Sequence, residues 1–380
     1  MKKIIKSLLA LEGIVKRGCE RVAVWVVCVR RLRSQMRING IENRPVDGER
    51  EYIQFWKKLQ PCVEPYSYRL FSRYMPDRAK WKYIIPEDIA HCFVDYYLNP
   101  PQFRDYYSDK NSYAMYLGDT PYLPETFLCR MQGGEILSSD FRPQGAMNAQ
   151  QTAAFCSGCD RLILKPSVGT SSGVGVMLFR RSGDVFTDGS GQRLDSDFLM
   201  RYSDDFVLQR AVRQHEDLAR FNPDSVNTIR LVAYRSVKDE KVYALSALLR
   251  IGSSGAFVDN AHAGGKFVGI DPASGCLNNY LCDQNGVRTG QHNGIDFSVE
   301  CFKVPHWDKV LAAAQEICSR ALHCRYFSLD LTVDEHDFPR MIELNVTWPG
   351  FWLSMFSGQL PLGDKTEEIV EYCRSRMCRG

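Results

Sequence analysis

The stretches FSLDLTVD (residues 327–334) and MIELNV (residues 341–346) decide the fold. In both, apolar and polar residues alternate with a period of two, and residues 335–339 between them are typical of a turn, so the pattern predicts a β-hairpin. We expect Asp330 of the first strand directly opposite Glu343 of the second, with their Cβ atoms roughly 4.5–5.5 Å apart. The hairpin therefore places two carboxylates side by side.

This register follows if Val333 pairs with Arg340 across the turn. Asn345 lies two residues beyond Glu343 and should point to the same face of the hairpin. The opposite face is predicted to be apolar and to carry Leu329, Leu331, Ile342 and Leu344.

Two carboxylates at that separation repel each other unless a cation lies between them. The oxygen ligands of Asp330, Glu343 and Asn345 suit Mg²⁺, which takes one or two carboxylates and completes its shell with water and substrate phosphates. The alternative is a solvated strand face on which the acids pair with Lys or Arg.

Composition is that of a globular protein, with 44% hydrophobic and 24% charged residues, and 380 residues are enough for two or three domains. The 14 cysteines are scattered from Cys19 to Cys378, which indicates reduced thiols of a cytosolic protein. The pair Cys156-x-x-Cys159 has no second pair or spaced histidine, so we interpret it as structural or incidental thiols and not as a zinc site.

The N-terminal segment is strongly basic. Residues 1–39 hold ten Lys/Arg and two Glu (+8), which leaves 38 basic and 43 acidic residues (−5) for the remainder, so the body does not have the charge of a nucleic-acid binder. Residues 1–37 are predicted to be a helix whose apolar stretch, Val22–Val29, is too short to span a bilayer. No signal-peptide cleavage site follows it. It is either an interfacial or docking helix, or a basic extension that packs its apolar side on its own body.

Domain boundaries follow from composition. Residues 1–40 form the basic helix, and residues 41–107, rich in aromatics and broken by prolines, are predicted to be a small helical domain.

A second chemical signal lies at residues 165–179, KPSVGTSSGVGVMLF. A strand ends in Lys165, a Gly/Ser/Thr loop follows, and the chain enters another apolar strand. Such loops bring backbone N–H groups and hydroxyls to phosphate oxygens because glycine permits close approach. The loop is neither a Walker A loop nor a dinucleotide-binding fingerprint, because no Gly-Lys-Ser/Thr closes it and a strand follows it. The alternative is an ordinary hairpin turn.

Further strands are predicted at residues 206–212 and 226–235, the latter with Thr228 and Arg230 on one face and residues 241–251 as its antiparallel partner. Residues 260–266 are a glycine-rich loop that begins with Asn260.

Taken in order, these signals resemble the ATP-grasp superfamily. They comprise Asp109-Lys110, Lys165 with its glycine-rich loop, Gln209–Val212, Arg230, Asn260 and Asp330…Glu343-x-Asn345. The segment Gln209…Gln214-His215…Asn222-Pro223…Ser225–Arg230 is similar to the sugar-transfer-associated branch. The resemblance covers roughly residues 105–360. It implies an α+β ATP-grasp fold, with two α+β subdomains enclosing a nucleotide cleft, behind the N-terminal helical domain. The small subdomain, with the glycine-rich loop, would comprise residues 108–206, and the large subdomain, with the metal site and a C-terminal helix, residues 207–380.

The resemblance also implies roles for residues. ATP and two Mg²⁺ ions would bind in the cleft, with Asp330, Glu343 and Asn345 as the metal ligands. The nucleotide would be bound by Lys110, Lys165, the loop residues Gly169, Ser171, Ser172 and Gly173, the adenine-pocket residues Gln209, Ala211 and Val212, and Asn260. Many members have glutamate where this chain has Gln209, whose amide oxygen can still accept from the adenine amino group.

The implied activity is that of a Mg²⁺-dependent, ADP-forming carboxylate–amine ligase, with Lys165 and Arg230 catalytic and an acyl phosphate as intermediate. Its substrates would be a small carboxylate and an amine, such as an amino acid and a sugar or cell-surface acceptor, in the cytoplasm. The acceptor pocket is sought at His262, Gly264, Gly265 and Trp348. Two alternatives remain: a kinase on the same scaffold, and a non-catalytic scaffold held at the inner face of the membrane by residues 1–37.

Overall fold

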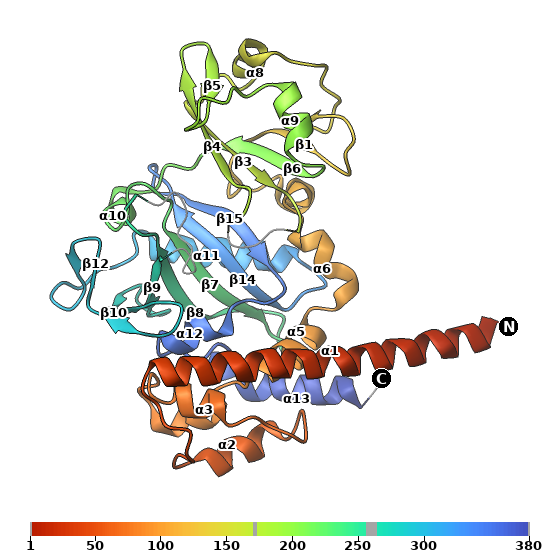
Figure 1. Ribbon diagram of the computed structural model, residues 1–380, viewed down its shortest axis with the longest axis vertical. Helices are drawn as coiled ribbons and strands as arrows, with labels where there is room; N and C mark the ends of the chain where they lie inside the picture. The colour runs from red at the N-terminus through yellow and green to blue at the C-terminus, as the bar shows by residue number, and fades with distance from the viewer. Residues whose placement is uncertain (1, 170–172, 256–263, 379–380) are drawn as a thin grey trace.

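The computed structural model describes residues 2–169, 173–255 and 264–378, with side chains from Lys16 onward (Figure 1). The chain is α+β, as predicted: N-terminal helices precede two antiparallel sheets. The N-terminal helices are α1 (Lys2–Ile38), α2 (Glu49–Trp56), α3 (Tyr66–Phe71), η1 (Arg78–Tyr83), α4 (Glu87–Ile89), η2 (Ala90–Val94), α5 (Asp95–Leu98), α6 (Pro101–Ser108), η3 (Lys110–Ser112) and α7 (Tyr113–Leu117).

The smaller sheet has the strand order β2-β1-β6-β3-β4-β5 and lies at the top of Figure 1. Its strands are β1 (Thr126–Arg130), β2 (Leu137–Ser138), β3 (Arg161–Pro166), β4 (Met177–Ser182), β5 (Val185–Thr187) and β6 (Phe206–Arg210), and helices α8 (Ala149–Phe155) and α9 (Ser196–Tyr202) accompany it. Helix α8 begins with a capping box of Asn148 and Gln151, which satisfies orphan backbone donors. Leu162, Leu164 and Leu208 are fully buried in this sheet's own core.

The larger sheet has the order β11-β10-β9-β8-β7-β14-β15, and all of its neighbouring strands are antiparallel. Its strands are β7 (Thr228–Arg235), β8 (Val242–Ile251), β9 (Lys266–Ile270), β10 (Leu277–Cys282), β11 (Arg288–Thr289), β14 (Tyr326–Val333) and β15 (Pro339–Asn345). The remaining elements are α10 (Glu216–Ala219), the pair β12 (Gln291–His292) and β13 (Ile295–Asp296), α11 (Trp307–Arg320), α12 (Phe351–Phe356), η5 (Gly363–Lys365) and α13 (Thr366–Met377).

Both faces of the larger sheet are covered, because strand side chains alternate between them. Ile229 and Leu231 of β7 pack in one cluster with Val310 and Ile317 of α11. On the other face, Tyr234 of β7 packs in a second cluster that contains residues of the N-terminal helices, α12 and α13. The sheet is thus the middle layer of three.

Helix α1 packs against α3 and α4 of the N-terminal helices (Figure 1). Leu32 and Met36 are buried against this module, and Arg31 forms an ion pair with the fully buried Glu87. Other apolar residues of the same helix remain exposed: Val22 by 63%, Trp25 by 41% and Val27 by 64%. Among the described residues, no helix is both long and apolar enough to cross a bilayer.

Candidate active site

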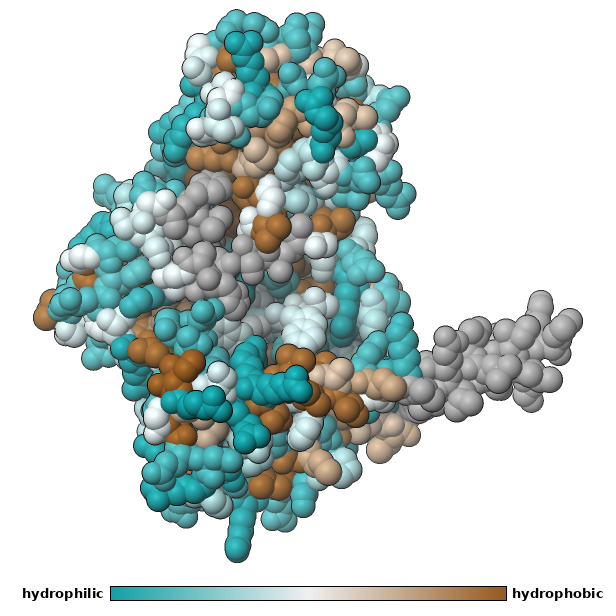
Figure 2. Space-filling model, in the orientation of Figure 1, coloured by the Kyte–Doolittle hydropathy of each residue, from teal (hydrophilic) through white to brown (hydrophobic). Residues whose placement is uncertain are grey.

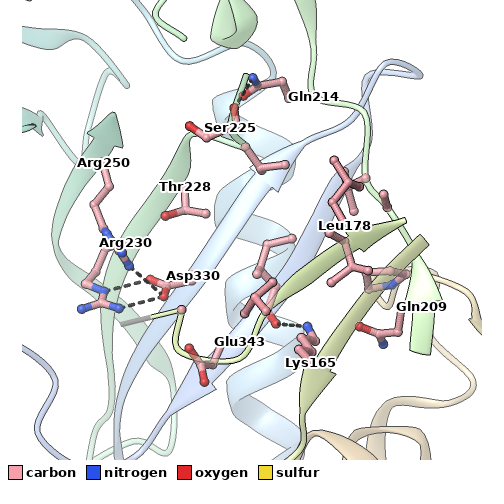
Figure 3. Close-up of a pocket in the computed structure, with 18 of the residues that line it drawn as sticks. Lys165, Leu178, Gln209, Gln214, Ser225, Thr228, Arg230, Arg250, Asp330 and Glu343 are labelled. Carbon is pink, nitrogen blue, oxygen red and sulfur yellow. Dashed lines mark hydrogen bonds and ion pairs between the residues drawn. The ribbon is translucent and has the colours of Figure 1, made fainter. Parts of the chain in front are cut away.

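A cavity of about 700 Å³ opens between the two sheets (Figure 3). Of the residues singled out in the sequence, it is lined by Lys110, Lys165, Gly173, Gln209, Ala211, Val212, Arg230, Asp330, Glu343, Asn345 and Trp348. Gly169, Gly264 and Gly265 are described but are not among the lining residues. Ser171, Ser172, Asn260 and His262 lie outside the described part of the chain.

The register of the acidic hairpin confirms the central prediction, since Asp330 of β14 is paired with Glu343 of β15. The predicted pairing of Val333 with Arg340 is wrong, because Val333 is paired with Pro339. A β-bulge at Ile342 absorbs the one-residue difference.

The bulge also moves Ile342, which lines the cavity and does not lie on the apolar face. Its carbonyl oxygen accepts a hydrogen bond of 3.2 Å from the Lys165 ammonium group at the end of β3 (Figure 3). An extra residue leaves its backbone unpaired in the ladder, so the bulge supplies an acceptor that joins the larger sheet to the smaller one.

Lys165 is 9% exposed, and its pKa is lowered to about 7. Burial is the main cause, the positive charge of Lys110 adds to it, and the carboxylate of Glu343 opposes both. Lys165 is therefore only partly charged near neutral pH.

Lys110 is placed by a short turn of helix, η3. The Asp109 side chain caps this turn by accepting from the Asn111 N–H (2.9 Å), and the Lys110 N–H donates to the Ser167 carbonyl (3.1 Å). The Lys110 ammonium group lies 2.8 Å from Glu343 Oε1. This lysine and Lys165 therefore face the acidic hairpin from outside the larger sheet.

Asp330 is 3% exposed, and its carboxylate accepts hydrogen bonds from two arginines (Figure 3). Arg230 Nε and Nη2 donate to its two carboxylate oxygens at 2.8 and 2.7 Å, and Arg250 Nη1 lies 3.2 Å from Oδ2. Burial acts to raise the pKa of Asp330, but the two guanidinium groups outweigh it, and the pKa is lowered. The acids thus pair with Lys and Arg, as in the alternative interpretation, but the face is not solvated, since Asp330 is buried.

Sequence reasoning missed Arg250, although its position was accessible. The neighbouring strands pair Thr228 of β7 with Arg250 of β8, and paired residues share a face of the sheet. Thr228 and Arg230 were expected on one face, and Arg250 joins them there. Working out the pairing register of the two predicted strands would have placed Arg250 beside Thr228.

The centre of the cavity carries excess positive charge. Lys110, Lys165, Arg230 and Arg250 contribute four formal positive charges and Asp330 and Glu343 two negative charges, so the sum is +2 with Lys165 protonated. A surface of this sign inside a concave site favours an anionic ligand such as a triphosphate.

The hairpin also offers ligands that suit Mg²⁺. Two carboxylates and an amide face the cavity, and oxygen atoms are the ligands that this ion prefers. Asn345 Nδ2 is buried without a hydrogen-bond partner among the described residues, and the amide oxygen, not this nitrogen, is the atom that would bind the ion. The donor set therefore fits a hard cation.

At the far end of the cavity, Ile163, Val176 and Leu178 form apolar walls beside Gln209. Gln209 is 6% exposed, and its amide nitrogen donates a hydrogen bond of 3.0 Å to Thr126 Oγ1. The amide oxygen is the atom of this side chain that can accept a hydrogen bond.

The backbone predicted to contact adenine is only partly free to do so. The Ala211 N–H already donates to the Arg161 carbonyl at 3.0 Å, so Ala211 can offer only its own carbonyl oxygen to a base edge.

Trp348 also lines the cavity and is 58% exposed. Its backbone has a left-handed φ of 47°, its N–H donates to Asp95 Oδ2 at 2.9 Å, and its ring stacks on His91 at 3.8 Å between centroids. Asp95 and His91 belong to the N-terminal helices. That module therefore supports the cavity rim, a role that the sequence did not indicate.

Binding of a triphosphate is expected to restore the proton of Lys165, because a nearby negative charge raises the pKa of an amine. At pH 8, above its pKa of about 7, Lys165 is mostly neutral, so nucleotide binding should take up close to one proton. At pH 6 the uptake should be near zero. Calorimetry of a non-hydrolysable ATP analogue with Mg²⁺, in two buffers of different ionisation enthalpy, measures it. Equal uptake by Lys165→Arg, whose guanidinium stays charged, would contradict this prediction.

Comparisons with known proteins identify the family of this chain. The family model described as sugar-transfer-associated ATP-grasp matches residues 97–369. A search of the curated proteins finds no match. Among solved structures, similarity is found to the L-amino acid ligase from Bacillus licheniformis, with 12% identity over 68% of this chain and 47% of that chain, and a TM-score of 0.33. This chain thus spans less than half the length of that ligase.

Two further structures are similar to this chain. The D-alanine–D-alanine ligase from Bacillus anthracis is 14% identical over 72% of this chain and 69% of that chain, with a TM-score of 0.37. The D-cycloserine synthetase DcsG is 12% identical over 93% of this chain and 96% of that chain, with a TM-score of 0.41. Because the family model covers more than two thirds of the sequence, the chain belongs to the sugar-transfer-associated ATP-grasp family.

Proposed function

We propose that the protein is an ADP-forming ligase that joins a carboxylate to an amine, using ATP and Mg²⁺. Family membership supports an ATP-dependent reaction. The observation that carries the proposal is the meeting of Lys110 and Lys165 with the hairpin acids Asp330 and Glu343 at one cationic cavity. Phosphoryl transfer requires mainly positioning and neutralisation of charge, and these groups supply both.

In the first step, a substrate carboxylate oxygen attacks the γ-phosphorus of ATP, the bond to the β,γ-bridging oxygen breaks, and ADP leaves. Lys110 and Lys165 neutralise charge that spreads over the phosphate oxygens. Asp330, Glu343 and Asn345 would hold Mg²⁺, which screens the phosphates as a Lewis acid. The product is an acyl phosphate.

In the second step, the amine attacks the acyl carbon, and inorganic phosphate leaves with the electron pair of the C–O bond. The amide forms once the nitrogen has lost a proton. We assign Arg230 to the oxyanion of the tetrahedral transition state, because its side chain lines the cavity and is fixed by two hydrogen bonds to Asp330.

The acceptor is proposed to enter past Trp348. An exposed indole held on His91 gives this end of the cavity a rigid, flat apolar surface beside Arg230. A sugar or other cell-surface acceptor that receives an amino acid would suit such a surface, since a ring can lie against the indole.

The test is a screen for ADP release over pairs of amino acids and amino sugars with Mg²⁺, with products identified by mass spectrometry. A ligase releases ADP only when both an acid and an amine are present, and an amide product appears. ADP release with a single hydroxyl acceptor and a stable phosphorylated product would replace the proposal with the kinase.

We also propose that α1 contacts an anionic membrane surface. Its exposed Val22, Trp25 and Val27 adjoin the exposed Arg30 and Arg33, and Figure 2 shows apolar and charged residues interleaved along this helix. A helix that exposes tryptophan, valine and arginine side chains together can lie on an anionic membrane surface, with the arginines attracted to the lipid headgroups.

The full chain is therefore expected to float with vesicles that contain anionic lipid, and not with neutral vesicles. Replacing Arg30 and Arg33 with Gln should weaken binding about 10–30-fold, because each basic residue contributes about 1 kcal/mol near such a surface. Trp25→Ser should weaken it too. The control is Val299→Ser, at a residue that is 81% exposed outside α1. Equal flotation with neutral vesicles, or an equal loss in the control, would contradict membrane contact through α1.

A further inference from the structure

Three metal-binding side chains meet outside the cavity. His215 precedes α10, His306 precedes α11, and Asp337 lies in the turn between β14 and β15. Asp337 Oδ1 lies 3.2 Å from His215 Nε2 and 3.3 Å from His306 Nε2, and all three atoms lie within 4.8 Å of one another. None of the three is among the residues that line the described cavity.

These distances fit a shared cation, and they lie at the long end of the range for a hydrogen bond. With Zn–N of about 2.0–2.1 Å and Zn–O of about 2.0–2.2 Å, the edges of a tetrahedral site are about 3.3 Å long. A charge-assisted N–H···O hydrogen bond is shorter, at about 2.7–2.9 Å. The two measured nitrogen–oxygen distances match the tetrahedral edge.

The backbone is held in an uncommon conformation at two of these positions. His306 has φ 50° and Asp337 has φ 63°, in the left-handed region that residues other than glycine rarely adopt. Hydrogen bonds fix the turn, with Lys309 Nζ donating to the Asp337 carbonyl at 3.0 Å and the Phe338 N–H to Asp334 Oδ1 at 3.0 Å. Asp and His adopt this region more readily than most other residues, and the hydrogen bonds of the turn hold Asp337 within reach of both imidazoles.

A second carboxylate, that of Asp217, lies near the other ring nitrogen of His215, Nδ1. Asp217 Oδ2 lies 3.7 Å from His215 Nδ1, which now accepts from the Asp217 N–H at 3.1 Å. A histidine that binds a cation through Nε2 carries its proton on Nδ1 and usually donates it to a carboxylate. Because Nδ1 accepts here, the proton of a neutral His215 lies on Nε2. Binding of a cation at Nε2 would move that proton to Nδ1 and end the hydrogen bond from the Asp217 N–H, with the Asp217 carboxylate as the nearby acceptor.

We propose that His215, His306 and Asp337 form a binding site for a divalent transition-metal ion such as Zn²⁺, with water completing the shell. Two imidazoles and one carboxylate are ligands of this class, whereas the oxygen set of the hairpin suits Mg²⁺. The side chains are 14%, 33% and 51% exposed, so an ion and its water can enter.

The ion would connect three segments at the edge of the cavity. Gln214, next to His215, and Glu335, two residues before Asp337, both line the cavity. A bound cation would therefore hold the α10 segment and the β14–β15 turn together and stiffen this rim. The site does not depend on the reaction catalysed in the cavity.

Equilibrium dialysis of the full chain against Zn²⁺, with metal analysis, tests the proposal without measuring activity. Excess Mg²⁺ occupies the oxygen site, and thiol binding is subtracted with His306→Asn. Asparagine tolerates the left-handed backbone, so this variant removes the imidazole and keeps the conformation. The matched control is His336→Ala, since His336 lies in the same turn with a side chain that is 78% exposed and outside the cluster.

We expect wild type and His336→Ala to bind one more Zn²⁺ than His306→Asn, and Asp337→Asn to bind it at least tenfold more weakly than wild type. Co²⁺ in that extra site should show d–d absorption without the charge-transfer band of a thiolate. Equal Zn²⁺ content in wild type and His306→Asn, both folded by circular dichroism, would overturn the proposal. So would a thiolate band that accounts for all bound Co²⁺.

Discussion

Glu343→Gln is expected to lower the Mg²⁺-dependent rate of ATP turnover by at least about 10²-fold, with partial recovery at high Mg²⁺. A metal held on transferring phosphates provides several kcal/mol of charge stabilisation, and each 1.4 kcal/mol is tenfold in rate. The substitution keeps the shape of the side chain but removes one of the two hairpin carboxylates. Steady-state ADP release as a function of Mg²⁺ concentration measures the effect.

The matched control is Glu335→Gln. Glu335 follows the same hairpin strand and lines the same cavity, but its side chain is 46% exposed and faces Arg213 at 3.9 Å. We expect less than a threefold change there. A Glu343→Gln enzyme with the Mg²⁺ dependence of wild type would remove Glu343 from the metal site.

Arg230→Ala is expected to lower turnover by about 10²–10³-fold and to leave the affinity for the ATP analogue nearly unchanged. The reason is that Arg230 is assigned to the amine-addition step and not to the nucleotide. Asp330 would keep the Arg250 guanidinium at 3.2 Å, so the buried carboxylate is not left without a cation. Turnover and calorimetric binding, measured on the same preparation, separate the two effects.

Two further variants test whether the effect is specific to the Arg230 guanidinium. Arg230→Lys keeps the charge but loses the paired donation to Asp330, so it should recover only part of the rate. Arg250→Ala should lower turnover less than Arg230→Ala does, because Arg250 donates one hydrogen bond to Asp330 and Arg230 donates two. Near-normal turnover in Arg230→Ala would exclude Arg230 from the mechanism.

The hairpin could be predicted from sequence because strict alternation reports which strand faces are buried. The pairing of Asp330 with Glu343 followed from that alternation and is present in the structure. The bulge at Ile342 was not predicted, although the adjacent apolar residues Met341 and Ile342 interrupt the alternation where the extra residue lies. Its consequence, an acceptor for Lys165, was therefore missed as well.

Contacts between segments far apart in sequence could not be predicted either. The stacking of His91 on Trp348 joins residues more than 250 positions apart, and no local pattern reports it. The cluster of His215, His306 and Asp337 likewise needs the three-dimensional fold, since each residue comes from a different segment. By contrast, Arg250 required only the register of two strands that the sequence had already indicated.

MgATP is expected to lie in the cavity with the metal on the acidic hairpin. A crystal structure with Mn²⁺ and a non-hydrolysable ATP analogue tests it most directly, because the anomalous signal of Mn²⁺ locates the ion independently of the nucleotide. We predict an anomalous peak bounded by Asp330, Glu343 and Asn345, with the triphosphate between it and the ammonium groups of Lys110 and Lys165. A nucleotide bound elsewhere, or no peak at these three side chains, would contradict the account.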